Sequence, residues 1–168
     1  QEFGDQLLFS YPDADSISTQ QRGYLQQYFD DFEGVLVSDE FADPELGYAR
    51  YIDVDSFIDH HLLNEFARNV DAFVLSTYLH KKRGGKVEMG PIWDFNGALG
   101  NPDYFEGWLT EGWHHENPEF PADNPNAYKW YERLFEDEAF QERYRARWRE
   151  LRRDALSTES MMADIDAV

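Results

Sequence analysis

Residues 69–100 read NVDAFVLSTYLHKKRGGKVEMGPIWDFNGALG. The run from Phe73 to Leu79 is rich in residues that favour β-strands, and the run from Val87 to Trp93 is a second such segment. Between them, the Gly84-Gly85 pair supplies the positive φ angles that a tight hairpin turn requires. The stretch therefore predicts one β-hairpin, with an aspartate just before it and another just after it.

The two aspartates that flank this hairpin are Asp71 and Asp94. Phosphoryl transfer needs one carboxylate to orient the acceptor hydroxyl and accept its proton, and another to hold Mg²⁺ on the nucleotide phosphates. Protein kinases have the same order of a catalytic-loop aspartate, a hairpin and an Asp-Phe-Gly metal site. Asn96 offers a further hard oxygen ligand. The order predicts Asp71 as the catalytic residue and Asp94, with Asn96, as metal ligands.

Each of these positions also has a purely structural interpretation. An Asp-Phe pair after a strand is common in ordinary turns, and Asp71 could cap the segment that follows Val70. Asn69 either contacts the active-site loop or ends the preceding helix in a left-handed conformation, which asparagine tolerates well. Trp93 either packs in the core or borders the nucleotide. We take Asn69 and Trp93 as candidate nucleotide-binding residues.

Helical patterns precede the hairpin. Ser18 or Thr19 can cap a first helix, whose apolar residues recur at helical spacing as far as Leu36. Asp55 is the expected N-cap of a second helix, which runs to about Arg68. These two helices lead directly into the segment that carries the first aspartate.

Beyond the hairpin, residues 100–127 hold four of the seven prolines and read as a long ordered loop or short helical turns. From about Asn126 the pattern is helical to the end of the chain. The arginines of residues 143–153 form a basic patch, which is usually a solvated face. The whole, residues 1–168, is predicted to be a single α+β domain in which helix dominates.

Composition excludes several classes of protein. A hydrophobic fraction of 42% excludes a disordered chain. The 34 acidic and 15 basic residues give a net charge of −19, so we expect no nucleic-acid partner. The absence of cysteine excludes disulfides, thiolate catalysis and cysteine-based zinc sites. The sequence contains no apolar run of about 18 residues, so it predicts no membrane-spanning helix.

A dense series of motifs resembles the core signature of the CotH (spore coat protein H) kinase family. In chain order they are YIDVDSFID (51–59), NEFARNVD (64–71), STYLHK (76–81), GKVEMGPIWDF (85–95) and GN (100–101). The resemblance implies the C-terminal lobe of an atypical, protein-kinase-like enzyme. Such enzymes use ATP with Mg²⁺ or Mn²⁺ to phosphorylate Ser or Thr residues of other proteins, and they are secreted or lie at a cell or spore surface. By this resemblance, Asp71 matches the catalytic aspartate and Asp94 the metal-binding one.

Two departures from the family bear on activity. The family usually has Asp-Phe-Asp, whereas Asn96 keeps a carbonyl oxygen but lacks the charge, which lowers the expected metal affinity. Family members also carry a β-rich N-terminal segment that completes the nucleotide site, and we expect it to precede residue 1. On that expectation residues 1–168 are inactive alone. The alternative is a non-catalytic pseudokinase, spore-coat assembly or surface-adhesion module, which a wide separation of Asp71 from Asp94 would favour.

Two pairs of adjacent histidines, His60-His61 and His114-His115, invite a zinc interpretation. Neighbouring side chains on a helix point about 100° apart, so the first pair is a poor chelate. The metalloprotease motif His-Glu-x-x-His is also absent. The sequence therefore predicts no zinc site.

Overall fold

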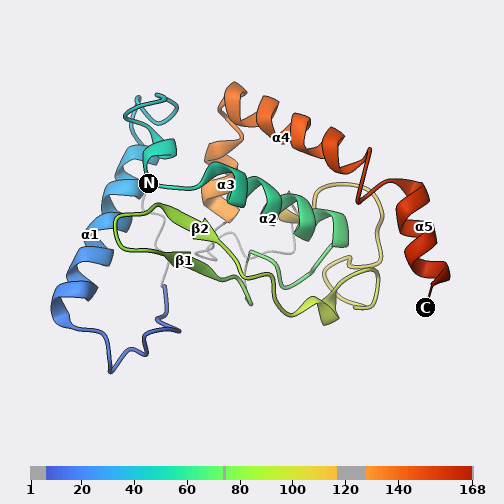
Figure 1. Ribbon diagram of the computed structural model, residues 1–168, viewed down its shortest axis with the longest axis horizontal. Coiled ribbons are helices and arrows are strands. Elements are labelled where there is room, and N and C mark those ends of the chain that lie inside the picture. Colours follow the sequence, from blue (N-terminus) through green and yellow to red (C-terminus); the bar gives the residue numbers. More distant parts are fainter. Residues whose placement is uncertain (1–6, 74, 117–127, 168) are drawn as a thin grey trace.

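The computed structural model describes residues 7–73, 75–116 and 128–167, except for the side chain of Tyr128. Within these ranges the chain is α+β and helix-rich, with five α-helices and one two-stranded antiparallel sheet, as the sequence predicts. Figure 1 shows α2 in the middle of the molecule, α1 at one end and α5 at the other. The helices are α1 (Thr19–Leu36), α2 (Val54–Ala67), α3 (Tyr128–Leu134), α4 (Glu138–Leu151) and α5 (Thr158–Asp166). The strands are β1 (Leu79–Lys81) and β2 (Val87–Met89), and the 3-10 helices are η1 (Tyr48–Arg50), η2 (Phe95–Gly97) and η3 (His114–Glu116).

Helix α1 begins at a capping box. Ser18 Oγ accepts a hydrogen bond from Gln21 N (3.2 Å), and the Gln21 side chain accepts one from Ser18 N (3.0 Å). Ser18, rather than Thr19, is therefore the N-cap. Further along α1, Phe32 and Leu36 are fully buried, so this helix contributes one wall of the core.

Helix α2 begins two residues earlier than the sequence predicts. Asp53 is its N-cap, because the Asp53 side chain accepts a hydrogen bond from Ser56 N (2.9 Å). The prediction of Asp55 was wrong, and Asp55 instead lies in the first turn, where the helix dipole favours a negative charge. The local pattern Asp-x-Asp offers two possible caps. The choice follows from a tertiary contact, since Asp53 N donates to Val87 O (2.8 Å) and holds Asp53 extended. The helix ends as expected at Arg68, which takes a left-handed φ of 45°.

Ion pairs join α2 to α4, which run alongside one another (Figure 1). Arg147 contacts Asp59 through two hydrogen bonds of 2.7 and 3.1 Å, and Arg143 pairs with Asp55 at 2.7 Å. Two of the arginines expected on a solvated face therefore bridge helices. Each such exposed pair contributes roughly 0–1 kcal/mol, so their main effect is to fix the register of the two helices.

The predicted hairpin is present, but its first strand is shorter than predicted. Leu79 pairs with Met89 and Lys81 pairs with Val87, and Gly84 takes a φ of 72° in the turn. The strand does not begin at Phe73, because Phe73 itself has a φ of 69°, which no extended strand allows. The second strand is also shorter than predicted, since it ends at Met89 and not at Trp93.

The C-terminal region is divided into three helices, not one continuous pattern. Asp137 caps α4 by accepting a hydrogen bond from Ala139 N (2.9 Å), and Ser157 caps α5. The expected helix start near Asn126 lies outside the described residues. Among the described helices, none has the length and apolar character of a membrane span.

The core is rich in aromatic side chains and is shared by α1, α2, β2, α3 and α4. Trp130 and Tyr131 of α3 are fully buried at its centre, where Trp130 stacks on Phe29 and meets Phe32 edge to face. Burying each large side chain contributes roughly 1.5–3 kcal/mol. This core holds α2 firmly, and α2 leads directly to Asp71.

Candidate functional site

The segment that carries Asp71 lies against η2, the turn that follows Asp94. Val70 N donates a hydrogen bond to Gly97 O (2.9 Å). A methyl group added at Gly97 would lie 3.1 Å from Val70 Cγ2 and 3.5 Å from Asp71 Oδ2. Glycine thus permits the close approach of the two segments, and a side chain there would press on the Asp71 loop.

A second contact joins the two segments at Asp94 itself. Ser76 Oγ donates a hydrogen bond to Asp94 Oδ2 (3.2 Å). Both residues have left-handed backbone conformations, with φ of 51° for Ser76 and 63° for Asp94. The hairpin therefore returns the chain so that Asp94 meets the loop that begins at Asp71. Asp71 and Asp94 thus lie on adjoining segments, and the roles expected of their carboxylates stay predictions.

Asp71 is half-buried, and its carboxylate accepts no hydrogen bond from the described residues. Its backbone is well fixed, since Asp71 N donates to Asn69 Oδ1 (3.3 Å) and Asp71 O accepts from Leu75 N (2.8 Å). The alternative role of a side-chain cap therefore has no support within the described segments. A fixed backbone with an unengaged carboxylate is suited to binding a hydroxyl group.

Asn69 is buried and orders the loop. Its side chain donates to Asn64 Oδ1 (3.3 Å) and accepts from Asp71 N, and only 2% of the residue is exposed. The left-handed position at the end of α2 belongs to Arg68, so the alternative role of Asn69 as a left-handed helix end is wrong. Asn69 instead contacts the loop that carries Asp71, through Asp71 N.

Asn96 and Trp93 both lie at the surface near Asp94. The Asn96 backbone carbonyl accepts a hydrogen bond from Asn101 Nδ2 (2.7 Å), and its side chain is exposed. Trp93 is 61% exposed, so the core interpretation of this tryptophan is wrong. An exposed indole next in sequence to Asp94 is available to a ligand.

Comparison with protein families identifies the family of the chain that carries these aspartates. The family model described as "CotH kinase protein" matches residues 4–168. The chain belongs to the CotH kinase family. Neither the comparison with curated proteins nor that with solved structures gave a match. Membership of the CotH family makes phosphotransfer the chemistry against which the site is best judged.

Ser76 is the residue of this CotH site that the sequence interpretation missed. It lies five positions after Asp71, and in protein kinases the fifth residue after the catalytic aspartate is an asparagine that holds a second Mg²⁺. Here the fifth residue after Asp71 is Ser76, whose hydroxyl donates a hydrogen bond to Asp94 Oδ2. The Asp-x₄-Asn spacing of protein kinases is the signal that would single out position 76. Because this chain has serine and not asparagine there, the sequence pattern did not indicate Ser76.

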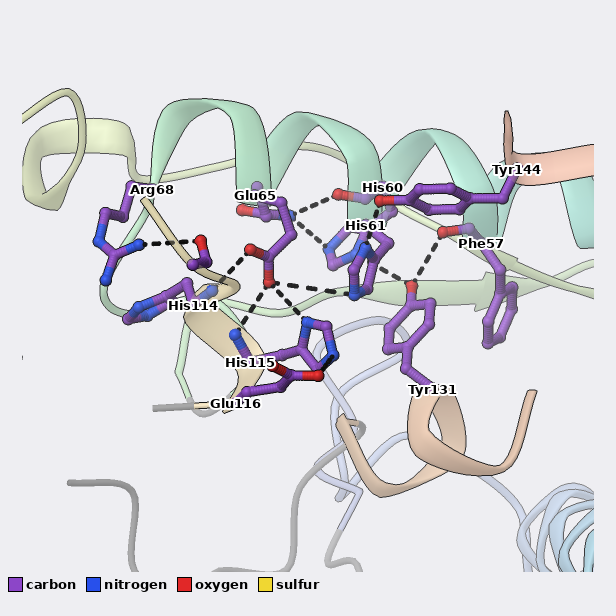
Figure 2. Close-up of polar contacts among 12 residues, drawn as sticks. Phe57, His60, His61, Glu65, Arg68, His114, His115, Glu116, Tyr131 and Tyr144 are labelled. Carbon is purple, nitrogen blue, oxygen red and sulfur yellow. Dashed lines mark hydrogen bonds and ion pairs between the residues drawn. The ribbon is translucent and has the colours of Figure 1, made fainter. Parts of the chain in front are cut away.

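A second polar cluster of the CotH chain lies between α2 and η3 (Figure 2). It consists of His61 and Glu65, one helical turn apart, and His115 of η3. Their candidate ligand atoms lie within 4.8 Å of one another. The sequence interpretation considered only adjacent histidines, which do not chelate together, and so it missed this combination.

Glu65 is the centre of this cluster. Its Oε2 accepts from His114 N (2.7 Å), and its Oε1 accepts from His115 N (2.9 Å) and meets His115 Nδ1 at 2.9 Å. Burial raises the pKa of Glu65, but the His115 hydrogen bond, the nearby histidine rings and the His114 amide outweigh it, so the net pKa is lowered. Glu65 is therefore a buried, anchored carboxylate.

Burial keeps the neighbouring histidines neutral. It lowers the pKa of His61 to about 3 and that of His60 to about 4, because an imidazolium in the core would lose its hydration. A cavity of about 810 Å³ opens beside the cluster, between α2, residues 112–116 and α4, and Glu65, His115 and Tyr144 line it. Neither Asp71 nor Asp94 does. The CotH chain thus carries two separate polar sites.

Proposed function

We propose that this chain is the catalytic lobe of an atypical, protein-kinase-like enzyme that transfers the γ-phosphoryl group of ATP to a Ser or Thr hydroxyl of a protein. The observation that carries the proposal is the meeting of the Asp71 loop and Asp94 at the base of one hairpin, through Ser76 Oγ to Asp94 Oδ2 (3.2 Å). Two carboxylates on adjoining, fixed segments are what phosphoryl transfer requires. Membership of the CotH kinase family supports the same reaction.

The donors around Asp94 suit Mg²⁺ or Mn²⁺, because all of them are oxygens. Asp94 is exposed, and its Oδ1 accepts no hydrogen bond from the described part of the chain. Asp94 would hold the ion, with the Ser76 hydroxyl and the Asn96 amide oxygen as neutral donors. A single negative charge in this set makes for modest metal affinity.

Asp71 has the role of the proton acceptor in this proposal. Asp71 would accept a hydrogen bond from the substrate Ser or Thr hydroxyl and so orient the hydroxyl oxygen toward the phosphorus. It would take up the hydroxyl proton as the ester bond forms. Asn69 would hold the Asp71 loop in place through its contact with Asp71 N. When bound, the nucleotide would supply the phosphoryl group, and the metal ion would neutralise the negative charge of that group.

Trp93 would border the nucleotide, and its exposed indole offers a face on which a purine base can stack. We place the enzyme outside the cell or at a cell or spore surface, with protein substrates, because the family resemblance implies both. The β-rich segment expected from the family would complete the nucleotide site, so the full-length protein is the one to assay.

The test compares isosteric variants of the two aspartates in the full-length protein. Asp71→Asn is expected to retain magnesium-dependent ATP binding but to lose transfer by roughly 10²–10⁴-fold, the usual contribution of a general base. Asp94→Asn is expected to weaken the metal-dependent part of ATP binding. Asparagine is the substitution of choice there, because it tolerates the left-handed φ of 63°. Calorimetry measures binding, and radiolabelled ATP with Ser- and Thr-containing peptides measures transfer.

Asp39→Asn is the matched control, since it removes the same charge at an exposed position in the turn after α1. It should change neither quantity. Normal transfer by Asp71→Asn would refute the catalytic assignment. Absence of ATP binding by the folded, unmodified protein would instead favour the non-catalytic module.

A further inference from the structure

We propose that His61, Glu65 and His115 form a binding site for a divalent transition-metal ion of the zinc class, separate from the site of Asp71 and Asp94. His61 Nε2 lies 4.0 Å from Glu65 Oε1, and His115 Nδ1 lies 2.9 Å from the same oxygen. Figure 2 shows the three side chains converging between α2 and η3. The site combines two residues of one helix face with a third from a remote loop.

The strongest indication is an unsatisfied nitrogen. His61 is fully buried, and its Nε2 has no hydrogen-bond partner within the described residues. Buried polar atoms are nearly always paired, so such an atom calls for an explanation. His61 Nε2 points toward Glu65, and the position between them is where a metal ion would sit.

The opposite side of the His61 ring is held by Tyr144. His61 Nδ1 and Tyr144 Oη are 2.9 Å apart. When Nδ1 donates its proton to Tyr144, Nε2 presents a lone pair toward Glu65 and His115. Histidines that bind metals typically have their second nitrogen fixed by such an outer partner, so Tyr144 is the positioning residue of this site.

His115 and Glu65 are equally well placed. The two backbone amides of His114 and His115 fix the Glu65 carboxylate, so its oxygens cannot turn away. The His115 ring stacks on Phe135 and contacts the His61 ring edge to face at 4.8 Å between centroids. Both imidazoles are thus oriented by packing before any ion arrives.

The donor set selects the class of metal. Two imidazole nitrogens and one carboxylate oxygen are the ligands of the His₂Glu zinc enzymes, whereas Mg²⁺ and Ca²⁺ prefer oxygen alone. In a tetrahedral zinc site with bonds of about 2.0–2.1 Å, ligand atoms lie roughly 3.3 Å apart. His61 must therefore approach by roughly 1 Å. His115 must give up its Nδ1 contact with Glu65 and hold its ring proton on Nε2, so that the Nδ1 lone pair faces the ion.

The cavity beside the cluster supplies access and the fourth ligand. Glu65 and His115 line the cavity of about 810 Å³, while His61 lies behind them. An ion and its remaining water can therefore reach the ligands from solvent. Three protein ligands with one open position characterise zinc sites that exchange ligands, as opposed to closed structural sites.

The experiment titrates the chelator-stripped 168-residue chain with Zn²⁺ by calorimetry, and with Co²⁺ while recording its visible absorption. We expect one ion per chain and the absorption bands of a four-coordinate Co²⁺ centre. His61→Phe and His115→Phe keep an aromatic ring in each packed position and should lower affinity by more than about 100-fold. Tyr144→Phe removes no ligand and should lower it by about 10–100-fold.

Two controls make the result specific. His80→Ala removes an exposed histidine whose only described ionic partner is Glu88, and Asp94→Asn alters the other site. Neither should change Zn²⁺ affinity. Should His61→Phe fail to fold, Tyr144→Phe and His115→Phe decide the matter. No stoichiometric binding by the unmodified chain, or binding that survives in both of these variants, would overturn the proposal.

Discussion

Unusual backbone conformations gather around the two aspartates. Among the described residues, the non-glycine residues with positive φ are Arg68, Phe73, Ser76, Asp94, Leu99, Phe105 and Glu106. All of them fall within residues 68–106, the region that forms the site. Such conformations cost about 1–3 kcal/mol each when the residue is ill suited to them, and they cluster at functional sites. The backbone strain of the described residues is therefore concentrated in this part of the chain.

Ser76→Asn is expected to strengthen metal binding at Asp94. Asparagine adopts a left-handed φ more readily than serine, so the φ of 51° favours the change. Its amide oxygen is also a better ligand than a hydroxyl that is engaged with Asp94 Oδ2. We expect the affinity for magnesium–ATP in the full-length protein to rise about tenfold, or ~1.4 kcal/mol.

Calorimetric titration of magnesium–ATP measures this effect, and Ser76→Ala is its control. The alanine variant removes the oxygen and is unsuited to the left-handed conformation, so it should bind more weakly than the unmodified protein. Equal binding by all three proteins would show that Ser76 does not act at the metal.

At the scale of the elements, α2 is the support on which both sites depend. Its N-terminal end is capped by Asp53 and linked to α4 through Asp59, its middle carries His61 and Glu65, and its C-terminal end leads to Asp71. Changes that fray this helix should therefore disturb both sites.

Replacing the cap should cost more stability than replacing its neighbour. Asp53→Ala removes the hydrogen bond to Ser56 N and should lower the free energy of unfolding by about 1 kcal/mol. Asp55→Ala removes an exposed pair with Arg143 and a favourable dipole contact, which together contribute roughly 0.5 kcal/mol. Urea unfolding of the two variants measures the difference, and a larger loss for Asp55→Ala would contradict the assignment of the cap.

Local sequence signals predict some of these elements and not others. The turn residues Gly84-Gly85 and the strand formers after them predict the hairpin correctly, because a hairpin depends on neighbouring residues. The strand propensity of Phe73 and of residues 75–78 is overridden by the tertiary structure, in which Phe73 and Ser76 have positive φ angles and Val70 N donates to Gly97 O. The balance between propensity and such a contact is invisible in the local pattern.

The residues of the two candidate sites also differ in whether the sequence can predict them. Asp71 and Asp94 are predictable from their order around the hairpin, and His61 with Glu65 from their spacing of four on one helix face. His115 is not predictable, because 50 residues separate it from Glu65 and it reaches the cluster through an irregular loop. Only the folded chain brings these three side chains together.

At the scale of the whole molecule, the buried histidines predict a loss of stability in mild acid. The pKa values of His60 and His61 are about 4 and about 3 in the folded chain, against 6.5 for an ordinary histidine. Between these values the unfolded chain binds more protons than the folded one, so stability is complete above pH 6.5 and falls as the pH decreases. From pH 7 to pH 5 each histidine should cost about 2 kcal/mol.

Urea unfolding at the two pH values, in the presence of a chelator, measures this loss. His61→Phe should remove its own share of this loss, about 2 kcal/mol between the two pH values. The sign is informative, because a chain with a net charge of −19 would otherwise gain stability in mild acid as its self-repulsion decreases. A free energy of unfolding that stays constant or rises from pH 7 to pH 5 would refute the prediction.

The second strand of the hairpin is anchored to the start of α2, whereas Gly84 in the turn is open to solvent. Asp53 N and Ser56 Oγ hydrogen-bond to the backbone of Val87 and Met89, whereas a methyl group added at Gly84 would meet nothing within 4 Å. An inserted peptide tag or fluorescent reporter at residue 84 would therefore project into solvent while both aspartates keep their places. Lengthening a surface turn costs only about 0.6 kcal/mol for each doubling of its length. The turn is thus a natural attachment point for following this protein in cells without disturbing its chemistry.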